Sequence, residues 1–470
     1  MPNAYQLMND QQLRDEVAAL EREADRLRSL HLSLDMARGK PNPAQTALSR
    51  PMLDLLGFDS DLTDQGVDAD NYGAPDGLPS ARALAAEILG VDPADVVVNG
   101  SSSLNLMHDA VANAYCHGIA GCEPWCRQGE VRFLCPVPGY DRHFAITDRF
   151  GIVNVPVPMR EDGPDMDMVR ELVEGDPAVK GIWCVPKFAN PTGVTYSDDV
   201  VRQFAALCPA ARDFRVYWDN AYAVHAFDGD VELLNVFDAL REAGNEDLVY
   251  EFASTAKVTF PSSGMAWVTA SPADMAELRA AFGAARVSPE KISQLAHVRF
   301  LRDAEGVREH MRRHAQLVAP RFALVQERLQ SGLGDLGCAT WTHPRGGHRR
   351  PRRRPGRQAH PGGRHVAVRQ RPARHQHPHR PNLPVHGGPR AGARRLRGRR
   401  AARLGAPGAG RARPCVTGAS GNRGSPATSV NIAARGTRVP PSGRVTYPSR
   451  LRTCVRHAHR HDTKHERLSR

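Results

Sequence analysis

Residues 181–257 contain three short apolar segments, GIWCVP (181–186), RVYWDN (215–220) and LVYEFAS (248–254). Runs of this length, rich in β-branched and aromatic residues and bounded by turn residues, are typical of buried strands. Helical patterns separate several of these runs. Strands that alternate with helices indicate a mainly parallel sheet with helices on both faces. These segments therefore predict an α/β fold with a doubly wound sheet.

The same alternation extends over most of the first 300 residues. Further strands are expected at DVVVNG (95–100), VRFLCPVPG (131–139) and GIVNVPV (151–157), and helices at ALAAEILG (83–90) and LNLMHDAVANAY (104–115). Leu13, Val17, Leu20 and Leu27 recur at helical spacing, which predicts a surface helix near residues 10–30. From about residue 273, two helical stretches (273–289 and 297–329) lead toward a second, smaller domain.

The composition changes abruptly at Gly347. Residues 345–470 contain 31 Arg and one Lys against Asp462 and Glu466, a net charge of +30; the whole chain carries +12, which leaves −18 for residues 1–344. One explanation is a disordered basic tail that binds nucleic acid by neutralising phosphates. The other is out-of-frame translation of GC-rich DNA. We favour the second, because the change falls in mid-domain without a linker, and we expect no specific nucleic-acid partner.

Other features of the composition exclude several classes of protein. No run of about 18 apolar residues occurs, so no membrane span is expected. The polar N-terminus lacks the basic start and apolar core of a signal peptide, which predicts a cytoplasmic protein. The nine cysteines are odd in number and scattered, as reduced thiols are. Cys116, Cys122, Cys126 and Cys135 match no zinc spacing, so we expect no metal site.

Four motifs follow predicted strands, at the edge of the sheet where ligands bind in doubly wound folds. They are Asn99-Gly100-Ser101-Ser102-Ser103, Asn190-Pro191-Thr192-Gly193, Asp219-Asn220-Ala221-Tyr222 and Ser254-Thr255-Ala256-Lys257. Each has an ordinary structural explanation when taken alone: a serine cap, a plain turn or an N-capping aspartate. A lysine among small residues at a strand end is less common, and lysines that form Schiff bases occupy such partly buried places.

The order and spacing of the four motifs resemble the fold type I enzymes that depend on pyridoxal phosphate (PLP). Within this group the chain is most similar to class I aminotransferases of the aspartate aminotransferase type, over about residues 5–346. The resemblance implies a large PLP-binding domain (51–300) after an N-terminal arm and helix (1–50). It further implies that residues 301–346 begin a small C-terminal domain, which the Arg/Pro/His-rich tail (347–470) interrupts.

The resemblance also implies the roles of the residues that form the catalytic centre. Lys257 would form the Schiff base with PLP and move the proton between the substrate's α-carbon and the cofactor. Asp219 would pair with the pyridinium nitrogen and keep it protonated, with His143 behind it. Asn190 and Tyr222 would hydrogen-bond the phenolic oxygen of the ring, and Asn190 would also border the substrate.

Further residues would hold the rest of the cofactor. Tyr140 would stack on the ring, and Tyr72 matches a tyrosine that reaches the phosphate of the neighbouring subunit, which implies a homodimer. The serines expected around the phosphate are Ser101, Ser102, Ser103, Ser254, Ser262 and Ser263. The last two would compensate for Met265, which stands where relatives carry a phosphate-binding arginine.

The resemblance also implies which residues would meet the substrate. Gly39 lies in the loop that the family closes over the substrate's α-carboxylate. The arginine that binds this carboxylate belongs to the small domain beyond Gly347, and no matching context occurs there, so we expect little transamination. Arg142, with Arg38 and Lys40 as weaker candidates, would meet a distal carboxylate, which favours aspartate or glutamate as amino donor and 2-oxoglutarate as acceptor.

Two other functions remain open from the sequence. One is a PLP-dependent lyase or decarboxylase on the same fold, because the motifs around the lysine do not separate these reactions. The other is an inactive remnant that binds nucleic acid non-specifically through the basic tail.

Overall fold

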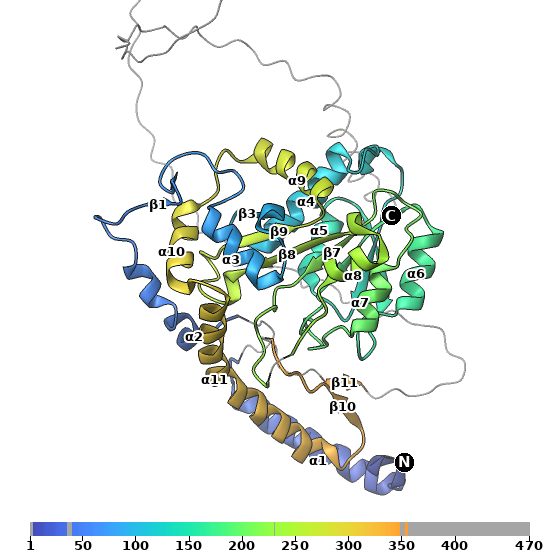
Figure 1. Cartoon of the computed structure of the whole chain (residues 1–470). Helices are drawn as coiled ribbons and strands as arrows, with labels where there is room; N and C mark the ends of the chain where they lie inside the picture. Colours follow the sequence, from blue (N-terminus) through green and yellow to red (C-terminus); the bar gives the residue numbers. More distant parts are fainter. Residues whose placement is uncertain (1–2, 35–39, 230, 348–352, 356–470) are drawn as a thin grey trace, which may run out of the picture. The chain divides into compact units, whose positions relative to one another are not determined.

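The computed structural model describes residues 3–34, 40–229, 231–347 and 353–355. Its centre is a seven-stranded sheet with the strand order β3-β9-β8-β7-β6-β4-β5 (Figure 1). Strands β5, β4, β6, β7 and β8 are parallel, and β9 runs antiparallel between β8 and β3. The strands span Val96–Val98 (β3), Arg132–Val137 (β4), Val153–Pro158 (β5), Val179–Cys184 (β6), Arg215–Asp219 (β7), Val249–Ser254 (β8) and Ala266–Thr269 (β9).

The described residues also form eleven α-helices and two short hairpins outside the sheet. The helices are α1 (Asp10–Ser29), α2 (Pro43–Ala47), α3 (Pro79–Leu89), α4 (Ser103–His117), α5 (Asp141–Arg149), α6 (Met166–Gly175), α7 (Asp198–Ala205), α8 (Val236–Ala243), α9 (Pro272–Ala285), α10 (Lys291–Leu301) and α11 (Ala304–Leu329). The hairpins pair β1 (Thr63–Asp64) with β2 (Val67–Asp68), and β10 (Ala339–Trp341) with β11 (Arg353–Pro355). Within the ranges that the structure describes, no helix is both long and apolar enough to span a membrane.

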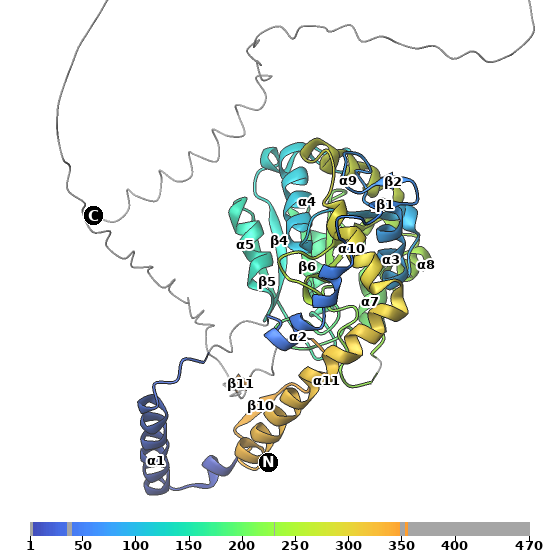
Figure 2. The same ribbon diagram turned by 90° about the vertical axis from the view of Figure 1, so that its left-hand side faces the viewer.

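Alternate residues of each central strand enter opposite apolar cores. Trp183 and Tyr217 pack toward α4 and α9, whereas Ile182 and Val216 pack toward α6, α7 and α8. In Figure 2, α4 lies on one side of the sheet and α7 and α8 lie on the other. Burial on both faces explains why the strand sequences are continuous apolar runs rather than alternating ones. Each fully buried large side chain contributes about 1.5–3 kcal/mol to folding.

Most predicted elements are confirmed, with two differences. The sequence did not predict β9, a four-residue strand that follows the lysine motif. The helical stretch expected over 297–329 is interrupted, because α10 ends at Leu301 and Arg302 adopts a positive φ of 67°. The side chain of Asp303 then caps α11 by accepting a hydrogen bond from Gly306 N. The predicted surface helix is α1, which buries none of its residues.

The carboxyl ends of the strands meet at one edge of the sheet. Strands β3 and β8 are both antiparallel to β9, so they are parallel to each other. The segments after β3, β4, β6, β7 and β8 therefore emerge on the same side.

Candidate active site

A pocket of about 320 Å³ opens at this edge of the sheet. It gathers side chains from segments that are far apart in sequence: they end or follow β4, β6, β7 and β8, or precede α2. The lining residues are Lys40, Tyr140, Asp141, Arg142, Val185, Asn190, Asp219, Ala221, Tyr222 and Lys257. Seven of these ten residues, all except Asp141, Val185 and Ala221, were expected from the sequence to bind cofactor or substrate.

Lys257 ends a single 3₁₀ turn, Thr255–Lys257, that directly follows β8. The turn is fixed by Thr255, whose backbone N–H donates to Met265 O and whose hydroxyl oxygen accepts from Met265 N, both at 2.8 Å. The carbonyl of Thr255 accepts from the backbone N–H groups of Val258 and Thr259. These hydrogen bonds fix the backbone that carries Lys257. The Lys257 side chain is half-buried, and its Nζ lies 4.8 Å from the centre of the Tyr222 ring.

Asp219 is the last residue of β7 and is 4 % exposed. Its Oδ2 lies 3.0 Å from Nε2 of His143, which is held by stacking on Trp183 at a ring separation of 4.8 Å. A carboxylate only accepts hydrogen bonds, so His143 donates from Nε2. The other carboxylate oxygen, Oδ1, is buried and has no hydrogen-bond partner among the described residues.

Three further residues form the walls of the pocket. Tyr140 precedes α5 and its ring meets the His143 ring edge to face at 5.0 Å. Burial raises the pKa of Tyr140, and the nearby charge of Lys257 partly opposes this effect. Tyr222 is buried, and the Oδ1 atom of Asn190 is buried without a partner in the described part of the chain.

The serine segments come together beside the lysine turn. A Cβ added at Gly264 would lie 2.9 Å from Ser101 O and 3.0 Å from Ala256 N, so only glycine allows these backbones to approach so closely. Ser102 occupies the N-cap of α4 and yet makes no capping hydrogen bond with its side chain. Ser103 and Ser254 are buried, whereas Ser262 and Ser263 are exposed. The serines are thus neighbours of the pocket rather than part of its described lining.

Several other predicted residues can be placed. Met265 is buried in the apolar core and cannot donate a hydrogen bond from its side chain. Tyr72 is 79 % exposed and does not line the pocket of its own chain. Lys40 and Arg142 are exposed at the pocket. Gly39, Arg38 and nearly all of the tail after Gly347 lie outside the described residues.

The side chains present fit PLP. Oδ1 of Asp219 is an orphaned buried acceptor on the pocket wall, which suits the N–H of a pyridinium ring. The free N-cap of α4 and the serines around Gly264 suit a phosphate, because a helix N-terminus offers N–H groups and a favourable dipole. A lysine that attaches the cofactor and an acid that binds its ring must line the same pocket, and Lys257 and Asp219 do so.

Sequence reasoning missed the support behind these residues. Trp183 was expected only as part of a strand, yet it stacks on His143. His225 was not singled out, and its Nε2 lies 3.3 Å from the carbonyl oxygen of Lys257. No local sequence signal marks either contact, since each joins residues more than 30 positions apart.

The sheet, its strand order and a lysine, an aspartate and a serine turn at one edge define an enzyme of the fold type I class. Comparisons with known proteins agree with this assignment. The family model described as aspartate aminotransferase matches residues 8–349. A Mycolicibacterium smegmatis protein assigned as an aminotransferase is 48% identical over 326 residues, which cover 68% of this chain and 76% of that protein. The aspartate aminotransferase of Corynebacterium glutamicum is 43% identical over 331 residues, which cover 70% of this chain and 76% of the relative.

Solved structures give the same result. The crystal structure of an aspartate transaminase from C. glutamicum superposes with a TM-score of 0.71 at 41% identity, covering 74% of this chain and 82% of that one. An α-aminoadipate aminotransferase from Thermus thermophilus, complexed with phosphopyridoxyl-leucine, shares the fold at 23% identity and a TM-score of 0.53. The chain belongs to the aspartate aminotransferase family, a family of PLP-dependent transaminases. This membership favours transamination over the lyase and decarboxylase alternatives.

Proposed function

We propose that this aminotransferase moves the amino group of an acidic amino acid, aspartate or glutamate, to a 2-oxo acid such as 2-oxoglutarate. The observation that carries the proposal is one pocket that holds Lys257 and Asp219 together with two cations, Lys40 and Arg142. The lysine and the aspartate suit the cofactor. The two cations suit the carboxylates of a dicarboxylic substrate.

Lys257 Nζ is the group that would hold PLP covalently and then carry the proton removed from the substrate's α-carbon. Its position supports both roles, because the turn of Thr255 fixes the backbone while the side chain points over the face of Tyr222. When bound, the cofactor supplies an electron sink for the negative charge that develops at the α-carbon.

Asp219 would keep a proton on the ring nitrogen of the cofactor. Its buried Oδ1 is the acceptor for that N–H, and His143 holds Oδ2 so that the carboxylate cannot turn away. Asn190 and Tyr222 would donate hydrogen bonds to the phenolic oxygen, and Tyr140 would cover the ring. Ser101, Ser102, Ser103, Ser254, Ser262 and Ser263 would surround the phosphate at the N-terminus of α4, where the Ser102 side chain makes no capping hydrogen bond within the described residues.

The orientation of the substrate is expected to be the weak point of this chain. The described pocket offers Arg142 and Lys40 as cations, and both are exposed. A bidentate arginine that fixes the α-carboxylate speeds the reaction by holding the α-hydrogen in line. We therefore propose that turnover is lower than in the relatives.

The predicted homodimer and domain division also remain proposals. Tyr72 is exposed, as a residue that serves a neighbouring subunit would be in a separated chain. Val307 and Met311 of α11 pack into a core shared with α3 and α10. The proposed division into a large domain and a small one therefore places the first turns of α11 against the large domain.

The test is a half-reaction with the cofactor-loaded protein and one amino acid at a time, followed by the visible absorbance. The account predicts that aspartate and glutamate convert the cofactor to its amine form at least tenfold more efficiently than alanine, and that 2-oxoglutarate reverses the change. The relative from C. glutamicum serves as a positive control for steady-state turnover. Equal efficiency with alanine would contradict the proposed substrate class, and release of ammonia or CO₂ would contradict transamination.

A further inference from the structure

Three consecutive residues, Lys257, Val258 and Thr259, each contact a different buried histidine. Nε2 of His225 lies 3.3 Å from the carbonyl oxygen of Lys257, and Nε2 of His310 lies 3.0 Å from that of Val258. These two histidines come from the loop after β7 and from α11, respectively. Since carbonyl oxygens only accept, both histidines donate from Nε2.

The third histidine, His297 of α10, binds the side chain of Thr259. Its Nδ1 lies 2.7 Å from Ser293 O and therefore donates. In the neutral ring Nε2 is then an acceptor, and the hydroxyl of Thr259 donates to it at 2.7 Å. His297 is fully buried, so this hydrogen bond is shielded from water.

Two further side chains, one from α11 itself, lie beside His310. Nε2 of His314, one helical turn further along α11, lies 3.2 Å from Nε2 of His310, and the hydroxyl of Ser49 lies 3.2 Å from the same atom. The amide of Gln45 in α2 approaches Nδ1 of His314 at 3.4 Å. The carbonyl of Val258 is thus bonded to α11, and the His310 and His314 rings lie beside the segment that follows Lys40.

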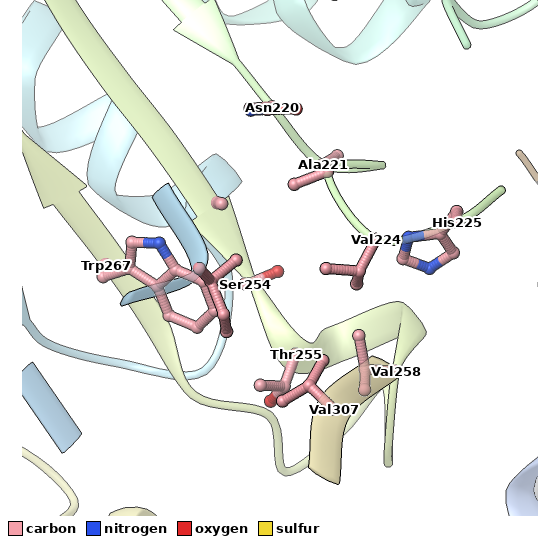
Figure 3. A pocket seen from close by; sticks show the side chains of 12 residues that line it. Asn220, Ala221, Val224, His225, Ser254, Thr255, Val258, Trp267 and Val307 are labelled. Carbon is pink, nitrogen blue, oxygen red and sulfur yellow. The ribbon is translucent and has the colours of Figure 1, made fainter. Parts of the chain in front are cut away.

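The side chain of Val258 lies on the apolar side of the lysine turn. Val258 borders a small cavity of about 10 Å³ that is lined mainly by aliphatic side chains, including Val224 and Val307 (Figure 3). The cavity has room for about one water molecule. The histidines contact the carbonyl groups of Lys257 and Val258 and the Thr259 hydroxyl, which also lies 3.2 Å from the carbonyl oxygen of Thr255.

We propose that His225, His297 and His310 are positioning residues that fix the backbone of residues 257–259, and thereby the place of Lys257 Nζ relative to the cofactor. This inference rests on the proposed function of Lys257. It assigns to these histidines a role in the geometry of the reacting amine and not only in the stability of the fold.

The charge states of His297 and His310 agree with this role. Burial lowers the pKa of His297 and His310, and burial together with His310 lowers the pKa of His314 to about 4. The charged group that contributes to the shift of His310 is Arg313, while Gln45 and Ser49 are uncharged. At physiological pH the rings of His297 and His310 are therefore neutral and keep the donor and acceptor pattern described above.

The test compares His310→Leu, which removes the donor, with His310→Gln, whose amide can still reach the Val258 carbonyl. Met311→Ala, a core change in the same helix, is the control for general destabilisation. Each full-length protein is loaded with PLP, and three quantities are measured: the cofactor dissociation constant, the pH midpoint of the visible absorbance of the lysine-bound cofactor, and the thermal midpoint of the apo-protein.

For His310→Leu we expect about tenfold weaker cofactor binding and a shifted pH midpoint, since a hydrogen bond to the support of the lysine is lost. His310→Gln should restore both, and Met311→Ala should lower only the thermal midpoint. If His310→Leu fails to fold, Thr259→Val, which removes the bond to His297, should produce the same spectroscopic shift.

Two results would overturn the proposal in different ways. If the His310 and Thr259 variants keep the wild-type pH midpoint and lose only thermal stability, the histidines are purely structural and the inference fails alone. If the wild-type protein shows no visible absorbance from lysine-bound cofactor, both the proposed function and this inference fail.

Discussion

Nε2 of His143 lies 3.0 Å from Oδ2 of Asp219, and both side chains are buried. This contact occupies one carboxylate oxygen and leaves Oδ1 at the pocket without a partner in the described residues. The pair therefore presents a fixed acceptor to the pocket, which is the arrangement that a protonated ring nitrogen requires.

Asp219→Asn is expected to lower kcat about 10²–10³-fold, because a neutral amide cannot stabilise the positive charge of the ring as it takes up electrons. The amide has nearly the same size, so the thermal midpoint should change little. Steady-state rates and thermal unfolding of the same preparation check this prediction. A loss below threefold would show that Asp219 does not contact the reacting ring.

His143→Gln is expected to have a smaller effect, roughly tenfold on kcat, since it weakens one hydrogen bond to a charged group but leaves the carboxylate in place. The double variant His143→Gln, Asp219→Asn should have a kcat only slightly below that of Asp219→Asn alone, because both changes act through the same carboxylate. Additive losses in this double-mutant cycle would indicate that His143 acts elsewhere.

Arg142→Gln is expected to raise KM for aspartate roughly three- to tenfold and to leave KM for alanine unchanged, since an exposed guanidinium contributes modestly to binding a distal carboxylate. The effect should shrink at high salt. Lys40→Gln is the matched comparison at the same pocket. Equal effects of Arg142→Gln on both amino acids would exclude a role in substrate choice.

The strands and the shared edge of the site could be predicted because burial on both faces produces continuous apolar runs. Strand β8 and the motif ending at Lys257 are an example, since the position of the lysine follows from the strand before it. The contacts of His225, His297 and His310 could not be predicted, because they join residues 32 to 52 positions apart. The fold brings these buried histidines to their partners, and a single buried histidine does not produce a periodic pattern in the sequence.

Glu251 offers a prediction about pH. It is buried in β8, where desolvation raises its pKa from 4.5 to about 7 despite a hydrogen bond from Asn220. The folded state therefore binds a proton that the unfolded chain releases above pH 4.5. The contribution of Glu251 to the free energy of unfolding is therefore fully present below pH 4.5 and is lost as the pH rises through 7.

Glu251→Gln should remove this loss and stabilise the protein at pH 8 by on the order of 2–3 kcal/mol, with little effect at pH 4.5. Urea unfolding at the two pH values measures the difference. A glutamine variant that is less stable than wild type at pH 8 would mean that the carboxylate is stabilised there by its surroundings.

The buried ion pair between Arg215 and Asp274 leads to a stability prediction. Two hydrogen bonds of 2.8 Å join the side chains, which are 5 % and 3 % exposed. Asp274→Ala alone should destabilise the protein by about 3–5 kcal/mol, because it leaves an uncompensated buried charge. The Arg215→Leu, Asp274→Leu double variant should be less destabilised than Asp274→Ala, as urea unfolding can show. A double variant that is the less stable of the two would mean that the unpaired charge of Arg215 is not what destabilises Asp274→Ala.

Chemical trapping can identify the lysine that binds the cofactor. The full-length protein is incubated with PLP, reduced with borohydride, digested and analysed by mass spectrometry, with Lys257→Ala treated in parallel. The account predicts a phosphopyridoxyl group on the peptide that contains Lys257 and none in the variant. Labelling of another lysine, such as Lys40 or Lys187, at equal yield in both proteins would contradict it.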